Sequence, residues 1–104
     1  MRIIIDENVP HPLLKYLAHH KSTSVQAEGW SGIKNGELLR RIDGNFDVFI
    51  LGDKNLQYQQ NLSDRRIAIV ELPTIRWPLL LPLIPDVVTA VDAARPGSYT
   101  VVGI

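Results

Sequence analysis

The segment Ile3–Pro10 has the sequence IIIDENVP, in which three β-branched apolar residues are followed at once by two acids, an amide and a proline. A short, continuous apolar run is typical of a strand that is buried on both faces, as in a parallel sheet. The abrupt change to charged residues predicts that this strand ends at Asp6. Two interpretations of Asp6 stay open: a metal-binding carboxylate at the strand end, or a cap or turn residue before a helix with Pro10 near its start.

The rest of the chain alternates between strand-like and helix-like patterns. Further strands are predicted at residues 23–27 (a weaker candidate), 47–51, 66–72 and 98–104. Helices are predicted at residues 10–20, 35–42, 56–62 and 86–94, with Asp86 as the N-cap of the last. This alternation, with nearly continuous apolar strands, predicts an α/β fold in which a mostly parallel sheet is covered by helices on both faces.

Composition limits the kinds of protein that this chain can be. Its 104 residues match one domain, residues 1–104. Eleven basic and eleven acidic residues cancel, so no overall field attracts nucleic acid or anionic membrane, although a local basic patch remains compatible with this balance. The absence of cysteine excludes disulfides and thiolate zinc sites and fits the cytoplasmic location that we expect. The N-terminus has no signal-peptide pattern.

The most apolar stretch is WPLLLPLIP, from Trp77 to Pro85. It is too short to span a bilayer and contains three prolines, so we expect no membrane contact. We interpret it as a packing segment. If it were exposed, it would form an apolar patch suited to a homodimer or another partner protein.

Three acids are expected at one edge of the predicted sheet. Asp6 ends the first strand, Asp53 follows the strand at 47–51, and Glu37 lies in the first turn of the helix at 35–42, after a glycine-rich loop. Ligands of parallel sheets bind beyond the carboxyl ends of the strands, and a divalent cation relieves the repulsion between carboxylates gathered there. Each acid also has an ordinary structural interpretation: a cap at Asp6, a complement to the helix dipole at Glu37, and a turn residue at Asp53.

Basic and histidine side chains give weaker signals. Lys34, Lys54, Arg65 and Arg66 are candidates for phosphate contacts, or are solvated surface residues. His19 and His20 are adjacent in the sequence. On a helix, adjacent side chains point in different directions, so we expect that these two do not chelate one metal together.

Four segments together resemble the small PIN-like proteins of the DUF5615 type: IIIDENVP, GWSGIKNGELL, FDVFILGDKNLQYQQNL and RIAIVEL. The resemblance extends from Met1 to about Pro96–Gly97. It implies a compact three-layer α/β/α sandwich, PIN-like and Rossmannoid. It also implies a ribonuclease that depends on Mg²⁺ or Mn²⁺ and acts as the toxin of a bacterial toxin–antitoxin pair, with RNA as substrate and a cognate antitoxin as partner.

The resemblance also assigns roles to residues of this chain. Asp6, Glu37 and Asp53 match the acids that bind the metal and catalyse cleavage, and Asn8 matches a supporting polar residue. Lys54 and Arg65 are then candidates to position the RNA strand.

Two departures from the family pattern weaken the predicted metal site. Leu51 stands where relatives often have threonine or serine, and Asn55 stands where they often have a second aspartate. Asn55 can offer an oxygen but no charge. The alternative function is therefore a catalytically weak or silent PIN-like module that binds RNA or a protein partner. A receiver-like phosphoacceptor is disfavoured because no lysine follows Lys54.

Overall fold

The computed structural model describes residues 1–52 and 65–103. Its strands are β1 (Arg2–Ile5), β2 (Lys21–Ser24), β3 (Val48–Leu51), β4 (Ala68–Glu71) and β5 (Tyr99–Val101). Its α-helices are α1 (Asn35–Ile42), α3 (Trp77–Leu80) and α4 (Ile84–Asp92), and its 3₁₀ helices are η1 (His11–Leu17) and η2 (Leu81–Leu83). The helix predicted at residues 56–62 lies outside the described residues.

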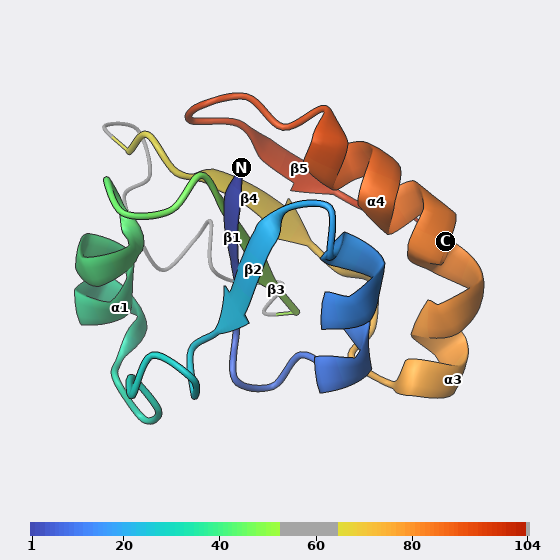
Figure 1. The fold of residues 1–104 in the computed structure, drawn as a ribbon, viewed down its shortest axis with the longest axis horizontal. Helices are drawn as coiled ribbons and strands as arrows, with labels where there is room; N and C mark the ends of the chain where they lie inside the picture. Colours follow the sequence, from blue (N-terminus) through green and yellow to red (C-terminus); the bar gives the residue numbers. More distant parts are fainter. Residues whose placement is uncertain (53–64, 104) are drawn as a thin grey trace.

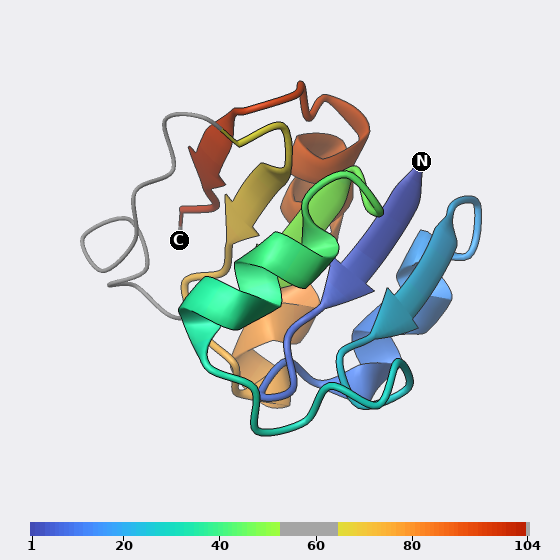
Figure 2. The ribbon, with the colours of Figure 1, turned by 90° about the vertical axis from the view of Figure 1, so that its left-hand side faces the viewer.

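The described strands form one five-stranded sheet in the order β2-β1-β3-β4-β5, and every neighbouring pair is parallel. Figure 1 shows the sheet between two helical layers, with α1 on one side and η1, α3 and α4 on the other. The strand arrows all point the same way in Figure 2, and α1 crosses in front of them in the opposite direction. The predicted α/β sandwich with a parallel sheet is thus confirmed.

The three central strands β1, β3 and β4 each contribute to both hydrophobic cores, because successive side chains point to opposite faces of the sheet. Ile3 and Ile5 of β1 pack with η1 and α4, whereas Ile4 packs with α1 on the other face. Apart from the exposed Arg2, the side chains of β1, β3 and β4 are almost completely buried. This burial explains why these three strands appear in the sequence as unbroken apolar runs.

Several predicted boundaries differ from those of the structure, and three of them have a clear physical reason. The second strand begins at Lys21 instead of Thr23, because it pairs with β1 from Arg2 onward. The helix predicted at 10–20 is a 3₁₀ helix that ends at Leu17. The last helix begins at Ile84, with Pro85 in its first turn, so Asp86 lies inside that turn and is not the N-cap. Proline is favoured there because its missing N–H has no helical partner.

The proline-rich stretch from Trp77 to Pro85 is partly packed and partly exposed. Leu80 is completely buried and Trp77 packs against the core, whereas the exposed fractions of Leu79 and Leu81 are 55% and 44%. The prolines sit at helix starts, in α3, η2 and α4. The stretch from Trp77 to Pro85 therefore packs in part against the core. Among residues 1–52 and 65–103, no helix has the length and apolar character needed to cross a bilayer.

Candidate functional site

The strand order contains one reversal, and it lies at β1. The chain leaves β1 to form β2 on one side and then forms β3 on the other side. In open parallel sheets, ligands bind outside the carboxyl ends of the strands at such a switch in direction. The edge of the sheet between the ends of β1 and β3 is therefore the first place to look for a functional site.

Asp6 lies directly at this switch point. Its backbone N–H donates to the carbonyl oxygen of Ile50 at 2.9 Å, which continues the β1–β3 ladder by one residue. Its side chain is partly buried, and Oδ1 accepts a hydrogen bond from the backbone N–H of Glu7 at 2.9 Å. That bond is the local contact expected of an aspartate at a turn. Asn8 is exposed in the same turn.

Asp53 lies outside the described residues, as do Lys54 and Asn55. Gly52 is the described residue that immediately follows Leu51 at the end of β3. Leu51 is buried in the core on the α1 face, so the residue that departs from the family pattern is a packing residue here.

The loop after β2 folds against the turn after β1. Nε2 of Gln26 donates to the carbonyl oxygen of Glu7 at 2.8 Å. The Oε1 atom of Gln26 is buried and accepts no hydrogen bond from residues 1–52 and 65–103. A buried oxygen without a donor is unfavourable, and a water molecule or a cation would satisfy it. Gln26 was not predicted as a site residue, because nothing in the pattern TSVQA indicates that this side chain turns toward the end of β1.

Glu37 occupies the first turn of α1, where the sequence predicted it. Its carboxylate is paired with two arginines of the same helix: Oε2 lies 2.8 Å from Nη2 of Arg40, and Oε1 lies 3.3 Å from Nε of Arg41. The hydrogen bond from Arg40, followed by that from Arg41, lowers the pKa of Glu37 below its usual 4.5. Glu37 is therefore an ionised acid, but a metal ion would have to compete with two guanidinium groups for it.

A buried acid that was not predicted as a site residue lies at the same edge. Glu71 ends β4, its exposed fraction is 5%, and the hydroxyl of Tyr99 donates to its Oε1 at 2.7 Å. The sequence RIAIVEL shows the acid, but only the fold shows its partner Tyr99, which lies 28 residues further along the chain. A buried, hydrogen-bonded carboxylate of this kind is typical of a structural contact between neighbouring strands.

The structure does not bring Arg65 close to Asp6. The carbonyl oxygen of Arg65 faces Gly97, before the start of β5, which is the opposite edge of the sheet. Arg66 is on that edge too, where its N–H donates to Asp43 Oδ1 at 3.0 Å. A hollow of about 640 Å³ is found there, and its lining includes Arg2, Arg66 and Arg95. These cations are separated from the strand-end acids by the length of the strands.

Within residues 1–52 and 65–103, the group that brings three possible metal-ligand atoms within 4.8 Å of one another is His19, His20 and Asp92. The predicted set of Asp6, Glu37 and Asp53 includes a residue outside the described part of the chain and stays a prediction.

We compared the chain with protein-family models, with curated proteins and with solved structures, and it matches none of them.

Proposed function

We propose that this chain is a metal-dependent ribonuclease that hydrolyses RNA phosphodiesters, with Asp6, Asp53 and Glu37 as its metal-binding and catalytic acids. One observation carries the proposal: Asp6 stands at the switch point of a parallel sheet, hydrogen-bonded to the strand that leads to Asp53. Sheets of this type bind their ligands at that point. The resemblance of the sequence to PIN-like proteins supports the same acids.

The residues at this edge suit Mg²⁺ or Mn²⁺, since they offer oxygen atoms, which these ions prefer. Oε1 of Gln26 is a further buried oxygen acceptor in the loop that contacts the turn after Asp6. A bound ion would supply charge to polarise the phosphoryl oxygen and to lower the pKa of an attacking water. Asp6 would fix the position of this charge, and Asn8, Lys54 and Asn55 would contact the RNA. Arg65 lies too far from Asp6 to serve the same step.

The biological setting rests on the resemblance alone. We propose that the chain is the toxin of a bacterial toxin–antitoxin pair, that it acts in the cytoplasm, and that a cognate antitoxin or a second copy of the chain is its protein partner. The exposed Leu79 and Leu81 are compatible with a protein contact.

Cleavage of single-stranded RNA in the presence of Mn²⁺ tests the proposal. We expect wild-type chain to cleave, and we expect Asp6→Asn and Asp53→Asn to reduce the rate at least about 100-fold, because a catalytic metal contributes several kcal/mol to transition-state stabilisation. Chelation of the metal should abolish cleavage by the wild type.

Asp86→Asn is the matched control, because Asp86 is an exposed acid in the first turn of α4. It belongs to the helical layer of η1, α3 and α4 and is not one of the proposed metal ligands. The variant should cleave like the wild type. Equal rates in wild type and Asp6→Asn would show that the activity comes from a contaminant and would overturn the assignment.

A second function is favoured by the pairing of Glu37 with Arg40 and Arg41. An acid held by two arginines, with Leu51 and Asn55 in place of polar and acidic residues, suits a silent module that binds RNA or protein through the same edge. Titration with Mn²⁺ separates the two functions. A nuclease binds Mn²⁺ with an affinity that falls in Asp6→Asn, whereas a silent module binds RNA with an affinity that the metal and this substitution leave unchanged.

A further inference from the structure

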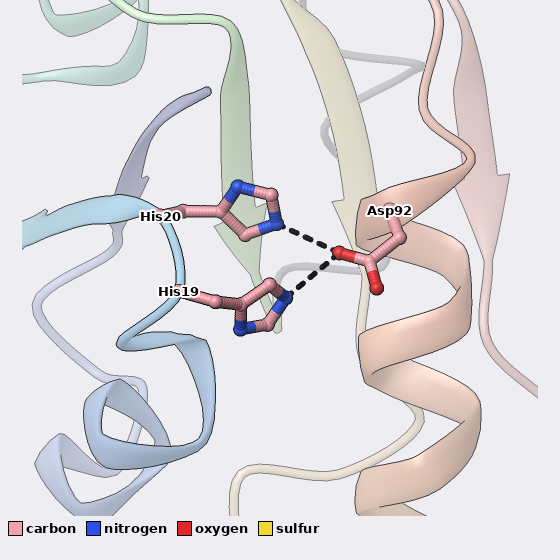
Figure 3. Close-up of side chains that lie close together, drawn as sticks. All are labelled: His19, His20 and Asp92. Atoms are coloured by element: carbon pink, nitrogen blue, oxygen red, sulfur yellow. Dashed lines mark hydrogen bonds and ion pairs between the residues drawn. The ribbon is translucent and has the colours of Figure 1, made fainter.

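A second cluster of polar side chains lies at the edge of the sheet where the strands begin, opposite to Asp6. It consists of His19 and His20, in the turn between η1 and β2, and Asp92, the last residue of α4. Both imidazoles point to the same carboxylate oxygen, as Figure 3 shows. Nε2 of His20 lies 2.7 Å and Nε2 of His19 lies 3.0 Å from Oδ1 of Asp92.

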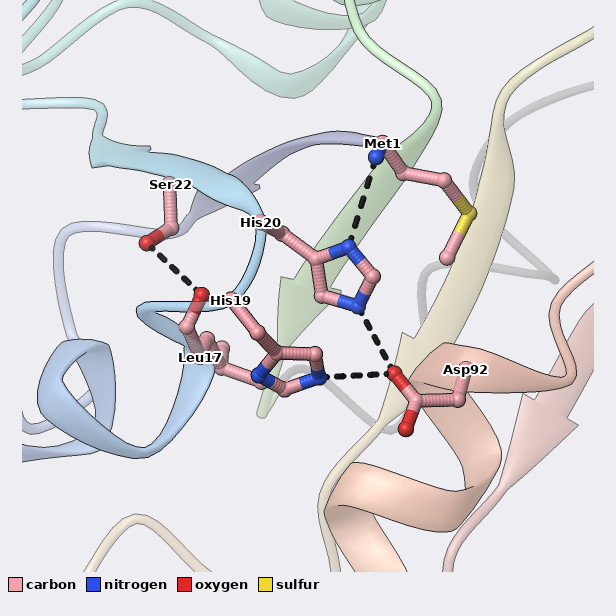
Figure 4. A network of polar contacts seen from close by, with 6 residues as sticks. All are labelled: Met1, Leu17, His19, His20, Ser22 and Asp92. Atoms are coloured by element: carbon pink, nitrogen blue, oxygen red, sulfur yellow. Dashed lines mark hydrogen bonds and ion pairs between the residues drawn. The ribbon is translucent and has the colours of Figure 1, made fainter.

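The expectation that adjacent histidines diverge was wrong because these residues are not helical. The 3₁₀ helix η1 ends at Leu17, and the N–H of His20 donates to the carbonyl oxygen of Leu17 at 3.0 Å, which closes a turn. The hydroxyl of Ser22 is directed at the same carbonyl oxygen at 3.4 Å (Figure 4). The turn places the two rings side by side, with centroids 4.1 Å apart.

Asp92 is an unusual residue for its position. The carboxyl end of a helix carries partial negative charge, so an acid there is unfavourable and a cation is favourable. The hydrogen bond from His20, and then that from His19, lowers the pKa of Asp92 below its usual 3.8. Two histidines therefore compensate for a carboxylate that the helix alone would disfavour.

We propose that His19, His20 and Asp92 form a binding site for a divalent transition-metal ion of the Zn²⁺ class. Two imidazole nitrogens and one carboxylate oxygen are a donor set that such ions prefer, whereas Mg²⁺ prefers oxygen atoms alone. A bound ion would lie about 2.0–2.2 Å from each ligand atom. The Nε2 atoms of His20 and His19 already lie 2.7 and 3.0 Å from Oδ1 of Asp92, so only a small outward movement of the side chains would make room for the ion.

The surroundings suit an ion that keeps water in its remaining positions. The exposed fractions of the side chains of His19 and Asp92 are 49% and 47%, and that of His20 is 13%. One ligand is thus fixed by packing and two are open to solvent. Nδ1 of His20 lies 3.3 Å from the backbone nitrogen of Met1 (Figure 4), a contact that orients the ring. A metal bound at Nε2 would require the ring proton on Nδ1, so this contact with the N-terminal ammonium would be lost on binding.

The site links two elements that are far apart in the sequence. His19 and His20 belong to the first quarter of the chain and Asp92 to the last helix, and α4 packs against η1. An ion bound here would clamp the η1–β2 turn to α4. Because Asp6 lies at the other end of the strands, this clamp is separate from the proposed nuclease site, and either proposal can fail without the other.

Calorimetric titration of the untagged chain with Zn²⁺ tests the proposal, with Co²⁺ as a spectroscopic probe of nitrogen ligation. We expect one high-affinity Zn²⁺ per chain, and at least a tenfold weaker affinity in each of His19→Gln, His20→Gln and Asp92→Asn. The chain contains a third histidine, His11, which is exposed in η1 and outside the cluster. His11→Gln is therefore the matched control and should bind Zn²⁺ like the wild type.

A second measurement guards against loss of folding in the variants. Circular dichroism should give wild-type spectra for all four variants, and Zn²⁺ should raise the melting temperature of wild type and His11→Gln but not of the two cluster histidine variants. Absence of Zn²⁺ binding by the wild type would overturn the proposal. Wild-type affinity in His19→Gln and His20→Gln would also overturn it, because the ion would then be bound elsewhere.

Discussion

Glu37 shows how one side chain can fit two roles at the residue scale. Its place in the first turn of α1 suits both a metal ligand and an acid that complements the helix dipole. The structure adds its two arginine partners, three and four residues further along the same helix. These spacings are those at which side chains on a helix meet, so the pairing could have been anticipated from the sequence EXXRR.

The pKa of Glu37 gives a direct test of this pairing. A carboxyl group with a pKa lowered in the folded state stabilises the protein above its unfolded pKa, and this contribution is lost as the pH falls through the lowered value. We expect the titration of Glu37, followed by ¹³C NMR of its carboxyl carbon, to give a pKa below 4.5. In the double variant Arg40→Gln/Arg41→Gln, the pKa of Glu37 should rise toward 4.5 because both hydrogen-bond donors are removed.

Arg76→Gln is the control for this titration, because Arg76 precedes α3 on the other face of the sheet. It should leave the titration of Glu37 unchanged. If the pKa of Glu37 is unaltered when both Arg40 and Arg41 are replaced, the pairing in the structure does not persist in solution.

At the scale of elements, α1 is held by one apolar face. Leu38, Leu39 and Ile42 are buried against the sheet, and the arginines and Glu37 lie on the exposed side. The spacing of these apolar residues predicted both the helix and its buried face. Asp43 follows the helix, and its Oδ1 accepts hydrogen bonds from the N–H groups of Arg66 and Ile67, both at 3.0 Å. This contact ties α1 to the start of β4.

Replacement of Leu39 by alanine measures what this face contributes. Leu39 is completely buried, so Leu39→Ala should lower the free energy of unfolding by about 2–5 kcal/mol, through lost transfer energy and the cavity that remains. Urea denaturation followed by circular dichroism gives this value. Leu79→Ala is the matched control, since Leu79 is 55% exposed in α3, and it should change stability by no more than about 0.5 kcal/mol. Similar effects of both substitutions would contradict the packing of α1 against the sheet.

Element boundaries were less predictable than the elements themselves. The start of β2 is set by pairing with β1, and the start of α4 by Pro85, so local preferences for Thr23 and Asp86 were overridden. The turn at His19 and His20 was missed for a related reason. Residues 10–20 have helical periodicity, but the helix formed is a short 3₁₀ helix that ends before the histidines.

At the scale of the whole molecule, the sheet joins two cores into one unit. Trp30 packs on the α1 face, where its ring meets Phe46 edge to face at 6.2 Å. Trp77 packs on the opposite face, where the centroid of its ring lies 6.1 Å from that of Tyr16. Because β1, β3 and β4 each contribute side chains to both cores, neither core can be lost while the other stays intact. The two tryptophans therefore report on opposite sides of one cooperative structure.

Two single-tryptophan variants, Trp30→Phe and Trp77→Phe, test this cooperativity. In each variant, urea unfolding followed by fluorescence and by circular dichroism should give the same midpoint, as for a two-state domain. A fluorescence transition of Trp77 at lower urea than the loss of circular dichroism would show that the layer of η1, α3 and α4 unfolds separately. That result would contradict a single unit.

The strand order also bears on the phosphoacceptor alternative at this scale. The order β2-β1-β3-β4-β5 is found in response-regulator receivers as well as in other doubly wound proteins. Acids at the ends of β1 and β3 would suit such a role. The chain has no lysine after Lys54, however, so the ends of β4 and β5 offer no ammonium group for a phosphoryl group. The strand order alone therefore does not support a receiver-like phosphoacceptor.

The fold class, the three central buried strands, the buried face of α1 and the position of Asp6 at a strand end were all predictable from the residues alone. Each depends on local periodicity and on the burial of apolar runs, which are properties of neighbouring residues. Four features became visible only in the folded chain: the strand order, the separation of Arg65 from Asp6, the partner of Glu71, and the contact of His19 and His20 with Asp92. These depend on which distant segments become neighbours, and that choice is made by packing of the whole chain around its sheet.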